Sequence, residues 1–209
     1  MAIKSLLTSL LASSLPMILA APTYNLGNLF RSRSESCPGT SSDAPQFFNG
    51  PFGNFPNISQ WVSFNDMFND NKQTMVDAGS TFDDVGRIAV AIENAAAQIG
   101  VDERVILGII MQESHGYVGV QTTFDADGVP TGGLMQASGC SGFDGQNNLP
   151  QADTSQMVTC GTTHYKQNLE EHGNLLATSS ILPALREYNS GSVDENDLSD
   201  APNCVGNPF

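Results

Sequence analysis

One carboxylate stands out because of the segment in which it lies. Glu113 follows an apolar run that starts near Val105, and it is the only acidic residue after Glu103 in the helix that this run predicts. The negative end of a helix dipole and apolar neighbours both disfavour an ionised carboxyl group. We therefore expect a raised pKa for Glu113, which would allow it to donate a proton near neutral pH. The alternative is a solvated glutamate at a fraying helix end.

Further polar motifs follow Glu113 in the chain. The segment around Glu113 reads MQESHG, and it is followed by a GGLMQ loop, by SQMV with a Gly-Thr pair, and by REYNSG; these lie at 111–116, 132–136, 155–162 and 186–191. In combination and order they resemble goose-type lysozymes and soluble lytic transglycosylases. The resemblance covers roughly residues 82–191. Upstream, Trp61 to Phe64 and Met75 resemble the lead segment of secreted fungal members.

This resemblance implies a role for each matching residue. Glu113 would be the catalytic acid, and Ser114 would hydrogen-bond the sugar or orient the carboxyl group. The backbone of the loop and an amide side chain would form a wall of the glycan cleft and hold an N-acetyl group; these residues are Gly133, Leu134, Met135 and Gln136. Tyr188 and Asn189 would close the cleft opposite Glu113, with the Tyr188 hydroxyl near the carboxyl group.

A second carboxylate would decide the mechanism. Inverting hydrolysis needs a base about 6.5–9.5 Å from the acid, whereas lytic transglycosylases use the 6-hydroxyl of the substrate. Asp127 matches the position of the goose-type aspartate, and Asp125 is a nearby alternative. The position of a second family aspartate holds Ser138. Both aspartates could instead belong to an Asp-Ala-Asp-Gly turn, so hydrolysis and anhydro-forming cleavage stay open.

The net charge excludes several kinds of partner. The chain has 209 residues, with 8 Lys and Arg against 22 Asp and Glu, which gives a formal net charge of −14. Nucleic acids and anionic membrane surfaces need clustered positive charge, so we exclude both. A neutral glycan is held by hydrogen bonds and aromatic contacts. We expect an N-acetylhexosamine polysaccharide as substrate, with peptidoglycan first and chitin second. A glycan-binding or host-interaction protein without activity is the competing class.

The N-terminal residues indicate export. Residues 1–20 have one lysine, a short apolar stretch with serines, and small residues at the end, which is typical of a secretory signal peptide. No later segment is long and apolar enough to span a bilayer. We therefore expect a secreted, extracellular protein. Residues 21–79 are interpreted as an irregular N-terminal extension with one amphipathic helix, and 80–209 as the lysozyme-like catalytic domain.

Export makes the cysteines and one sequon interpretable. Four cysteines in a secreted chain favour two disulfides. We favour Cys140–Cys160, which closes a local loop, and Cys37–Cys204, which ties the two ends together. Asn57 begins the sequence Asn-Ile-Ser, a possible site of N-glycosylation.

The expected fold is mainly α-helical, with a lysozyme-like domain and a small β-hairpin near 128–132. Helices are predicted from about 80 to 100, capped by Ser80 and ended by Gly100, and then from Asp102 to near 116. The second of these is apolar on nearly all sides and should be the central helix. Two more helices are predicted over 155–172 and 180–189, followed by an acidic, solvated tail.

Histidines and cofactors play no part in the expected chemistry. His115 follows Ser114 and is expected to be a structural residue or to lie at the edge of the cleft. His164 and His172 lack the spacing of a metal site, so we expect no metal and no cofactor. The aromatic stripe of Trp61, Phe64 and Phe68 is interpreted as core, and the protein as a monomer.

Overall fold

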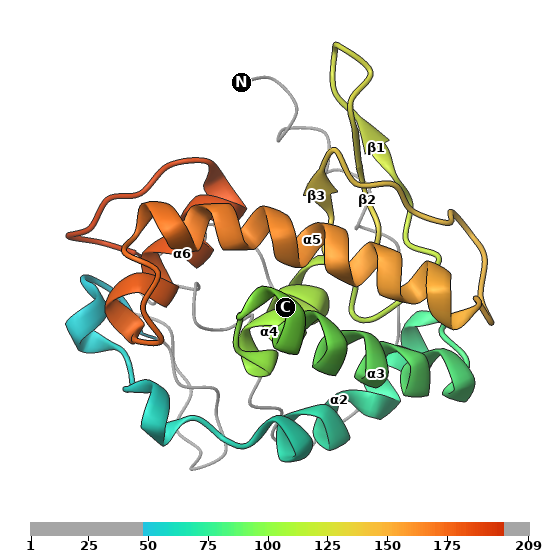
Figure 1. The fold of residues 1–209 in the computed structure, drawn as a ribbon, viewed down its shortest axis with the longest axis horizontal. Coiled ribbons are helices and arrows are strands. Elements are labelled where there is room, and N and C mark those ends of the chain that lie inside the picture. Colours follow the sequence, from blue (N-terminus) through green and yellow to red (C-terminus); the bar gives the residue numbers. More distant parts are fainter. Residues whose placement is uncertain (1–47, 199–209) are drawn as a thin grey trace, which may run out of the picture.

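A computed structural model describes residues 48–198 of the chain. The fold is mainly helical and includes a small antiparallel sheet, which confirms the coarse fold class (Figure 1). Two short 3-10 helices, η2 and η3, come first, and the other elements follow. Their bounds are η2 Phe52–Asn54, η3 Ile58–Gln60, α2 Phe64–Ala78, α3 Phe82–Ile99, α4 Glu103–Glu113, β1 Thr123–Phe124, β2 Pro130–Gly132, β3 Ala137–Ser138, α5 Gln151–Glu171 and α6 Thr178–Ser190.

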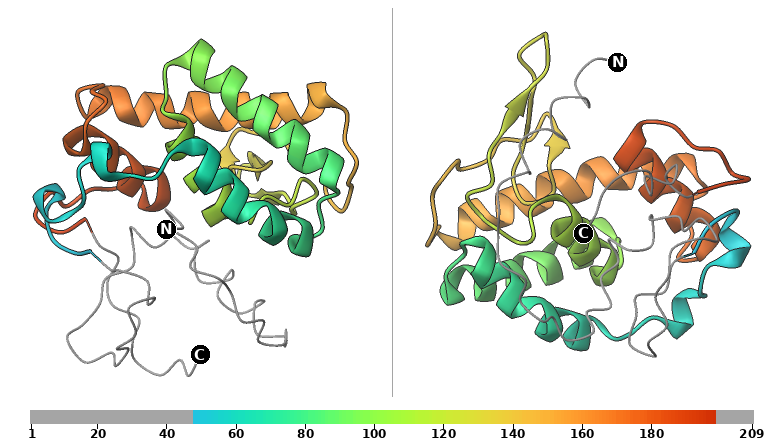
Figure 2. Two further views of the ribbon diagram at one scale, coloured as in Figure 1. Left: turned by 90° about the horizontal axis from the view of Figure 1, so that it is seen from below. Right: turned by 180° about the vertical axis from the view of Figure 1, so that it is seen from behind.

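Helix α4 is the central helix, as its apolar sequence predicts. All seven residues from Val105 to Met111 are buried. It begins at the predicted cap, Asp102, whose side chain accepts a hydrogen bond from Arg104 N, and α3 before it ends at the predicted Gly100 in a left-handed conformation. Helix α5 crosses the molecule from one end to the other in all views (Figures 1 and 2). The long helix α5 therefore supports the core against which the other elements pack.

The predicted extension belongs to the same core. Helix α2 buries Met67, Phe68 and Met75, and these side chains form one hydrophobic cluster with those of α3 and α4. Trp61 and Phe64 pack against this cluster while half-buried, in agreement with the interpretation of the stripe as core. The boundary proposed at residue 80 is thus not a break in packing.

Three helix ends differ from the prediction. The cap of α3 is Thr81, not Ser80, because the capping box pairs Thr81 with Asp84; the Ser80 hydroxyl instead donates to Gly116 O. Helix α5 begins directly after Pro150 and so runs four residues longer at its start than predicted. Pro183 lies inside α6, because α6 starts two residues earlier than predicted.

The sheet contains the predicted hairpin and one more strand. β1 pairs with β2 and β2 with β3, both antiparallel, with Thr123 opposite Thr131 and Thr131 opposite Ser138. The connection between β1 and β2 projects away from the helices (Figure 1). The turn between β2 and β3 faces the helices instead, and it holds the Gly-Leu-Met-Gln segment.

One predicted disulfide is confirmed. Cys140, after β3, is joined to Cys160 in α5, so the sheet is covalently tied to the long helix. Cys37, Cys204 and the signal peptide lie outside the described residues. The two ends of the described chain meet, since Leu198 N donates to Gly50 O. Leu198 is buried, so the acidic tail returns to the domain instead of staying fully solvated. No described helix could cross a membrane.

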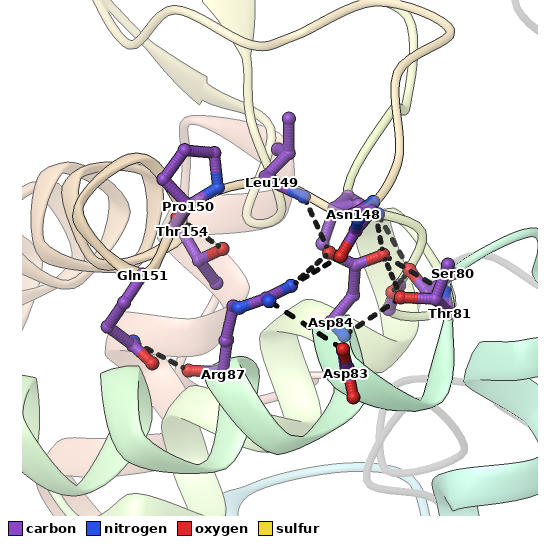
Figure 3. A network of polar contacts seen from close by, with 12 residues as sticks. Ser80, Thr81, Asp83, Asp84, Arg87, Asn148, Leu149, Pro150, Gln151 and Thr154 are labelled. Atoms are coloured by element: carbon purple, nitrogen blue, oxygen red, sulfur yellow. Dashed lines mark hydrogen bonds and ion pairs between the residues drawn. The ribbon is translucent and has the colours of Figure 1, made fainter.

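A buried carboxylate anchors the loop that leads into α5. The Asp84 side chain accepts hydrogen bonds from Thr81 N, Asn148 N at 2.7 Å and Leu149 N at 2.8 Å (Figure 3). Burial disfavours the charged form, but these hydrogen bonds outweigh it and hold the pKa of Asp84 below its ordinary value of 3.8. Because Asp84 is fully buried, its loss would leave buried N–H groups without acceptors.

We predict that Asp84→Ala lowers the free energy of unfolding by about 3 kcal/mol, the cost of several unsatisfied buried donors. The contribution of Asp84 is present above the ordinary pKa of 3.8 and is lost as the pH falls through the lower pKa of the folded state. Denaturant unfolding at neutral and acid pH measures both effects. The control is Asp83→Ala, since the Asp83 side chain is 77% exposed and its pairing with Arg87 should contribute under about 1 kcal/mol. Equal losses in the two variants would contradict the anchor.

Candidate active site

Glu113 is the last residue of α4 and is half-buried. The helix ends there because the chain turns through two residues with left-handed φ, His115 at 53° and Gly116 at 73°. His115 Nδ1 lies 2.8 Å from Met111 O, so its ring caps a carbonyl group of the helix end. This contact agrees with the expected structural role of His115.

Gly116 allows α2 to support this turn. A Cβ atom at this position would lie 2.4 Å from Met75 Cγ, closer than any side chain tolerates. Met75 is fully buried, so the predicted extension packs directly under the residues that follow Glu113. No signal in the sequence links Met75 to Gly116, because the contact depends on how α2 crosses α4.

The loop from Gly133 to Gln136 is held from two sides. Ser114 Oγ donates to Leu134 O at 2.8 Å, and the Tyr188 hydroxyl donates to Met135 O at 2.6 Å. The structure therefore brings together the end of α4, the loop and the Tyr-Asn segment of α6. These three segments are far apart in the chain.

Of the residues from Gly133 to Gln136, only Gln136 is not buried. Leu134 and Met135 are 0% and 1% exposed as whole residues and lie in the hydrophobic core, so neither their side chains nor their backbone face solvent. Gln136 is half-buried, and its Nε2 donates to Gly133 O within the loop. Ser114 is 8% exposed and its hydroxyl group donates to carbonyl groups, so the contact that the structure gives this residue is with the loop.

Tyr188 is enclosed by α5 and lies close to Glu113. The rings of His164 and Tyr165 meet the Tyr188 ring edge-on, with centroids 5.5 and 6.1 Å away. Burial first, and the Glu113 carboxylate second, raise the pKa of Tyr188 well above its ordinary value of 10.0. Tyr188 is therefore a neutral hydroxyl across the physiological pH range, and the Glu113 carboxylate lies near enough to interact with it electrostatically.

Two residues that flank Tyr188 complete this end of α6. Asn189 is half-buried and directly follows Tyr188. A carboxylate oxygen of Glu187 lies 2.9 Å from His172 Nε2. This contact joins the end of α5 to α6. Sequence reasoning missed His164 and Tyr165 as ring contacts of Tyr188 and His172 as a partner of Glu187. The eight-residue spacing of the two histidines on one predicted helix was the available signal, and it was considered only for metal binding.

A glycine in α5 allows the long helix to approach the loop. A Cβ atom on Gly161 would lie 2.4 Å from Met135 Cβ, and Thr162 Oγ1 lies 3.6 Å from Met135 Sδ. Both residues are buried. The Gly-Thr pair thus sets the distance between α5 and the loop, and through Met135 it sets the position of the carbonyl group that Tyr188 binds.

Asp125 and Asp127, the candidate bases, lie in the projecting hairpin, and the third position, Ser138, has no carboxylate. Asp125 Oδ1 accepts from Asp127 N at 2.9 Å and from Val129 N at 2.8 Å, which is how an aspartate closes a turn. Asp127 is exposed in the same connection, which projects away from the helices (Figure 1). Ser138 is exposed in β3. These contacts favour the interpretation of Asp125 as a turn residue.

A hollow of about 160 Å³ lies on the side of Tyr165 formed by α4, α5 and the start of α6. Its lining comes from the turn between α3 and α4, from α5 and from the connection to α6, and includes Tyr165, Leu175 and Leu176. None of the predicted site residues lines it. Within residues 48–198, no group of three or more His, Cys, Asp or Glu could hold a metal ion.

No protein family, curated protein or solved structure matches this chain in comparisons with known proteins. The candidate site therefore rests on the geometry of the described residues and on the motifs of the sequence.

We predict that Gly161→Ala destabilises the protein by about 1–3 kcal/mol, because the new methyl group overpacks against Met135. Gly86→Ala in α3 is the matched control, since a Cβ atom there meets nothing within 4 Å and should stabilise the helix by up to about 1 kcal/mol. Thermal unfolding measures both variants. A Gly161→Ala protein as stable as the control would show that α5 does not set the position of the loop.

Proposed function

We propose that this chain is a secreted glycosidase that cleaves β-1,4 links in an N-acetylhexosamine polymer, with Glu113 as the general acid and peptidoglycan as the first candidate substrate. The observation that carries the proposal is that the Glu113 carboxylate lies within electrostatic range of the half-buried Tyr188 hydroxyl, at the loop where the separate motifs meet. A lysozyme-like fold and the resemblance to goose-type lysozymes and soluble lytic transglycosylases are part of the same proposal.

The Tyr188 hydroxyl supports the position of Glu113 beside the loop. Tyr188 has one hydroxyl proton, and that proton is directed at Met135 O at 2.6 Å. That bond fixes the Tyr188 hydroxyl at the loop, and Glu113 lies close enough to interact with it electrostatically. This arrangement suits an acid that protonates the glycosidic oxygen as the bond to the leaving sugar breaks.

Within the loop from Gly133 to Gln136, only Gln136 is accessible to a sugar. Leu134 and Met135 use their side chains in the core, and their carbonyl groups accept from Ser114 and Tyr188. Gln136, half-buried with φ at 45°, presents the one polar side chain of this loop. It is the residue that we assign to the N-acetyl group, together with Asn189 from α6.

We predict that Glu113→Gln lowers the rate of glycan cleavage by about a hundredfold or more, the range that general acid catalysis contributes. Glutamine keeps the shape of the side chain and removes the proton. Glu103→Gln is the matched control, because it removes a carboxylate from the first turn of the same helix and should leave the rate unchanged. Release of soluble fragments from peptidoglycan measures both variants.

Mass spectrometry of the same fragments separates the two mechanisms. Reducing ends indicate hydrolysis, and 1,6-anhydro ends indicate attack by the 6-hydroxyl of the substrate. If Glu113→Gln cleaves as fast as the parent, the assignment of the acid is wrong. If the parent binds glycan but releases nothing from peptidoglycan or chitin, the chain is a binding protein.

Chitin is the second candidate, and the charge distribution favours it. The chain carries 8 basic residues against 22 acidic ones. Several of the basic side chains are engaged: Arg87 lies 3.5 Å from Asp84, Arg104 pairs with Asp102 at 2.8 Å, and Lys166 Nζ donates to an asparagine. Such a surface repels an anionic bacterial wall but has no effect on the approach to uncharged chitin.

We predict that salt separates these substrates. Raising the ionic strength shortens the Debye length from about 30 Å at 0.01 M to about 8 Å at 0.15 M. Cleavage of peptidoglycan by the parent should therefore become several-fold faster, while cleavage of chitin oligomers should not change. Initial rates on the two substrates, read side by side across this range, test the prediction. A peptidoglycan rate that falls with salt would show that attraction, not repulsion, governs the approach to the wall.

A further inference from the structure

The glycosidase proposal makes no use of the sequon at Asn57. Asn57 is exposed and forms the N-cap of η3. Its Oδ1 atom accepts from Ser59 N and from Ser59 Oγ, each at 3.0 Å. The acceptor Asn57 and the hydroxyl residue Ser59 of the sequon are thus in direct contact in the folded protein.

The capping contacts use only the oxygen of the Asn57 amide. Asn57 N donates to Gln60 Oε1 at 2.9 Å, which completes the capping box. Within residues 48–198, no hydrogen bond is formed by Asn57 Nδ2. An N-linked sugar replaces one hydrogen on Nδ2 and leaves the carbonyl oxygen in place. The cap of η3 and a glycan on Asn57 are therefore compatible.

The residues on both sides hold the sequon in place. Pro56 O accepts from Trp61 Nε1 at 3.1 Å, and Ile58 O accepts from Arg104 Nη1 at 3.2 Å. Arg104 also lies over the Trp61 ring, 5.3 Å from its centroid. Both neighbours of Asn57 are half-buried while Asn57 itself is exposed. The Asn57 side chain is therefore held at the protein surface, where an attached glycan displaces no core residue.

We infer that Asn57 carries an N-linked glycan in the secreted protein. The donor is an oligosaccharide linked to a lipid diphosphate. Asn57 Nδ2 forms a bond to C1 of the first N-acetylglucosamine as the bond between C1 and the phosphate oxygen breaks. The lipid diphosphate leaves, and the amide proton passes to a base of the transferring enzyme. The inference requires entry into the secretory pathway, and it does not depend on whether the protein cleaves glycans.

The full chain, secreted from a eukaryotic host, tests this inference through its intact mass. The parent should carry extra mass that peptide-N-glycosidase removes, with conversion of Asn57 to aspartate. Asn57→Asp should lose that mass while it keeps the cap, because a carboxylate oxygen accepts the same hydrogen bonds. Ser59→Thr should keep the mass, because threonine also completes a sequon.

Two results would overturn the inference. One is a parent chain whose mass is that of the polypeptide alone, whether the chain is secreted or retained in the cell. The other is an Asn57→Asp variant with the same glycosidase-sensitive mass as the parent. Thermal unfolding of Asn57→Asp should stay near that of the deglycosylated parent, which separates the loss of the glycan from any loss of the cap.

Discussion

The candidate site depends on the hydrogen bonds that the buried carbonyl groups of one loop accept. The loop from Gly133 to Gln136 has left-handed φ at both ends, 71° and 45°, so it cannot pair its carbonyl groups as a strand or helix would. A buried carbonyl group without a partner costs about 1–3 kcal/mol. The Ser114 hydroxyl donates to Leu134 O, and the Tyr188 hydroxyl donates to Met135 O. Each of these hydroxyl groups comes from a different helix, so satisfying the loop also fixes α4 and α6 beside it.

This requirement explains why small and buried residues recur around the loop. Gly161 lets α5 come within contact of Met135, and Gly116 lets Met75 come under the end of α4. The disulfide between Cys140 and Cys160 joins the strand after the loop to the same helix. A single misplaced methyl group in this cluster would move Met135 O away from the Tyr188 hydroxyl. The geometry at Glu113 therefore depends on packing that involves no catalytic group.

Local patterns were sufficient to predict much of the fold. The apolar run that ends at Glu113 indicated a buried helix, Gly100 and Asp102 indicated its start, and loop closure favoured the Cys140–Cys160 disulfide; the structure confirms each of these. The cap of α3 was misplaced by one residue because Ser80 and Thr81 are equally good caps in isolation. The choice is made by Asp84, whose carboxylate also holds Asn148 and Leu149, and such a distant contact leaves no periodic signal. For the same reason the role of Ser114 could not be predicted: its neighbour Leu134 is adjacent only in the fold.

The three sequence positions considered for a second carboxylate bear on the mechanism of the proposed cleavage. Asp125 uses one oxygen to close the hairpin turn, Asp127 is exposed in the same turn, and Ser138 has no carboxylate. Hydrolysis with inversion needs a base held across the sugar from the acid, at about 6.5–9.5 Å. A carboxylate in a projecting turn is held by few contacts, whereas Glu113 ends a helix that is buried from Val105 to Met111. For the glycosidase activity that we propose, cleavage that uses one carboxyl group, first as acid and then as base, with a hydroxyl of the substrate as nucleophile, needs only the carboxylate at the end of α4. That mechanism requires no catalytic residue in the hairpin, and Asp125 then has only its role in the turn.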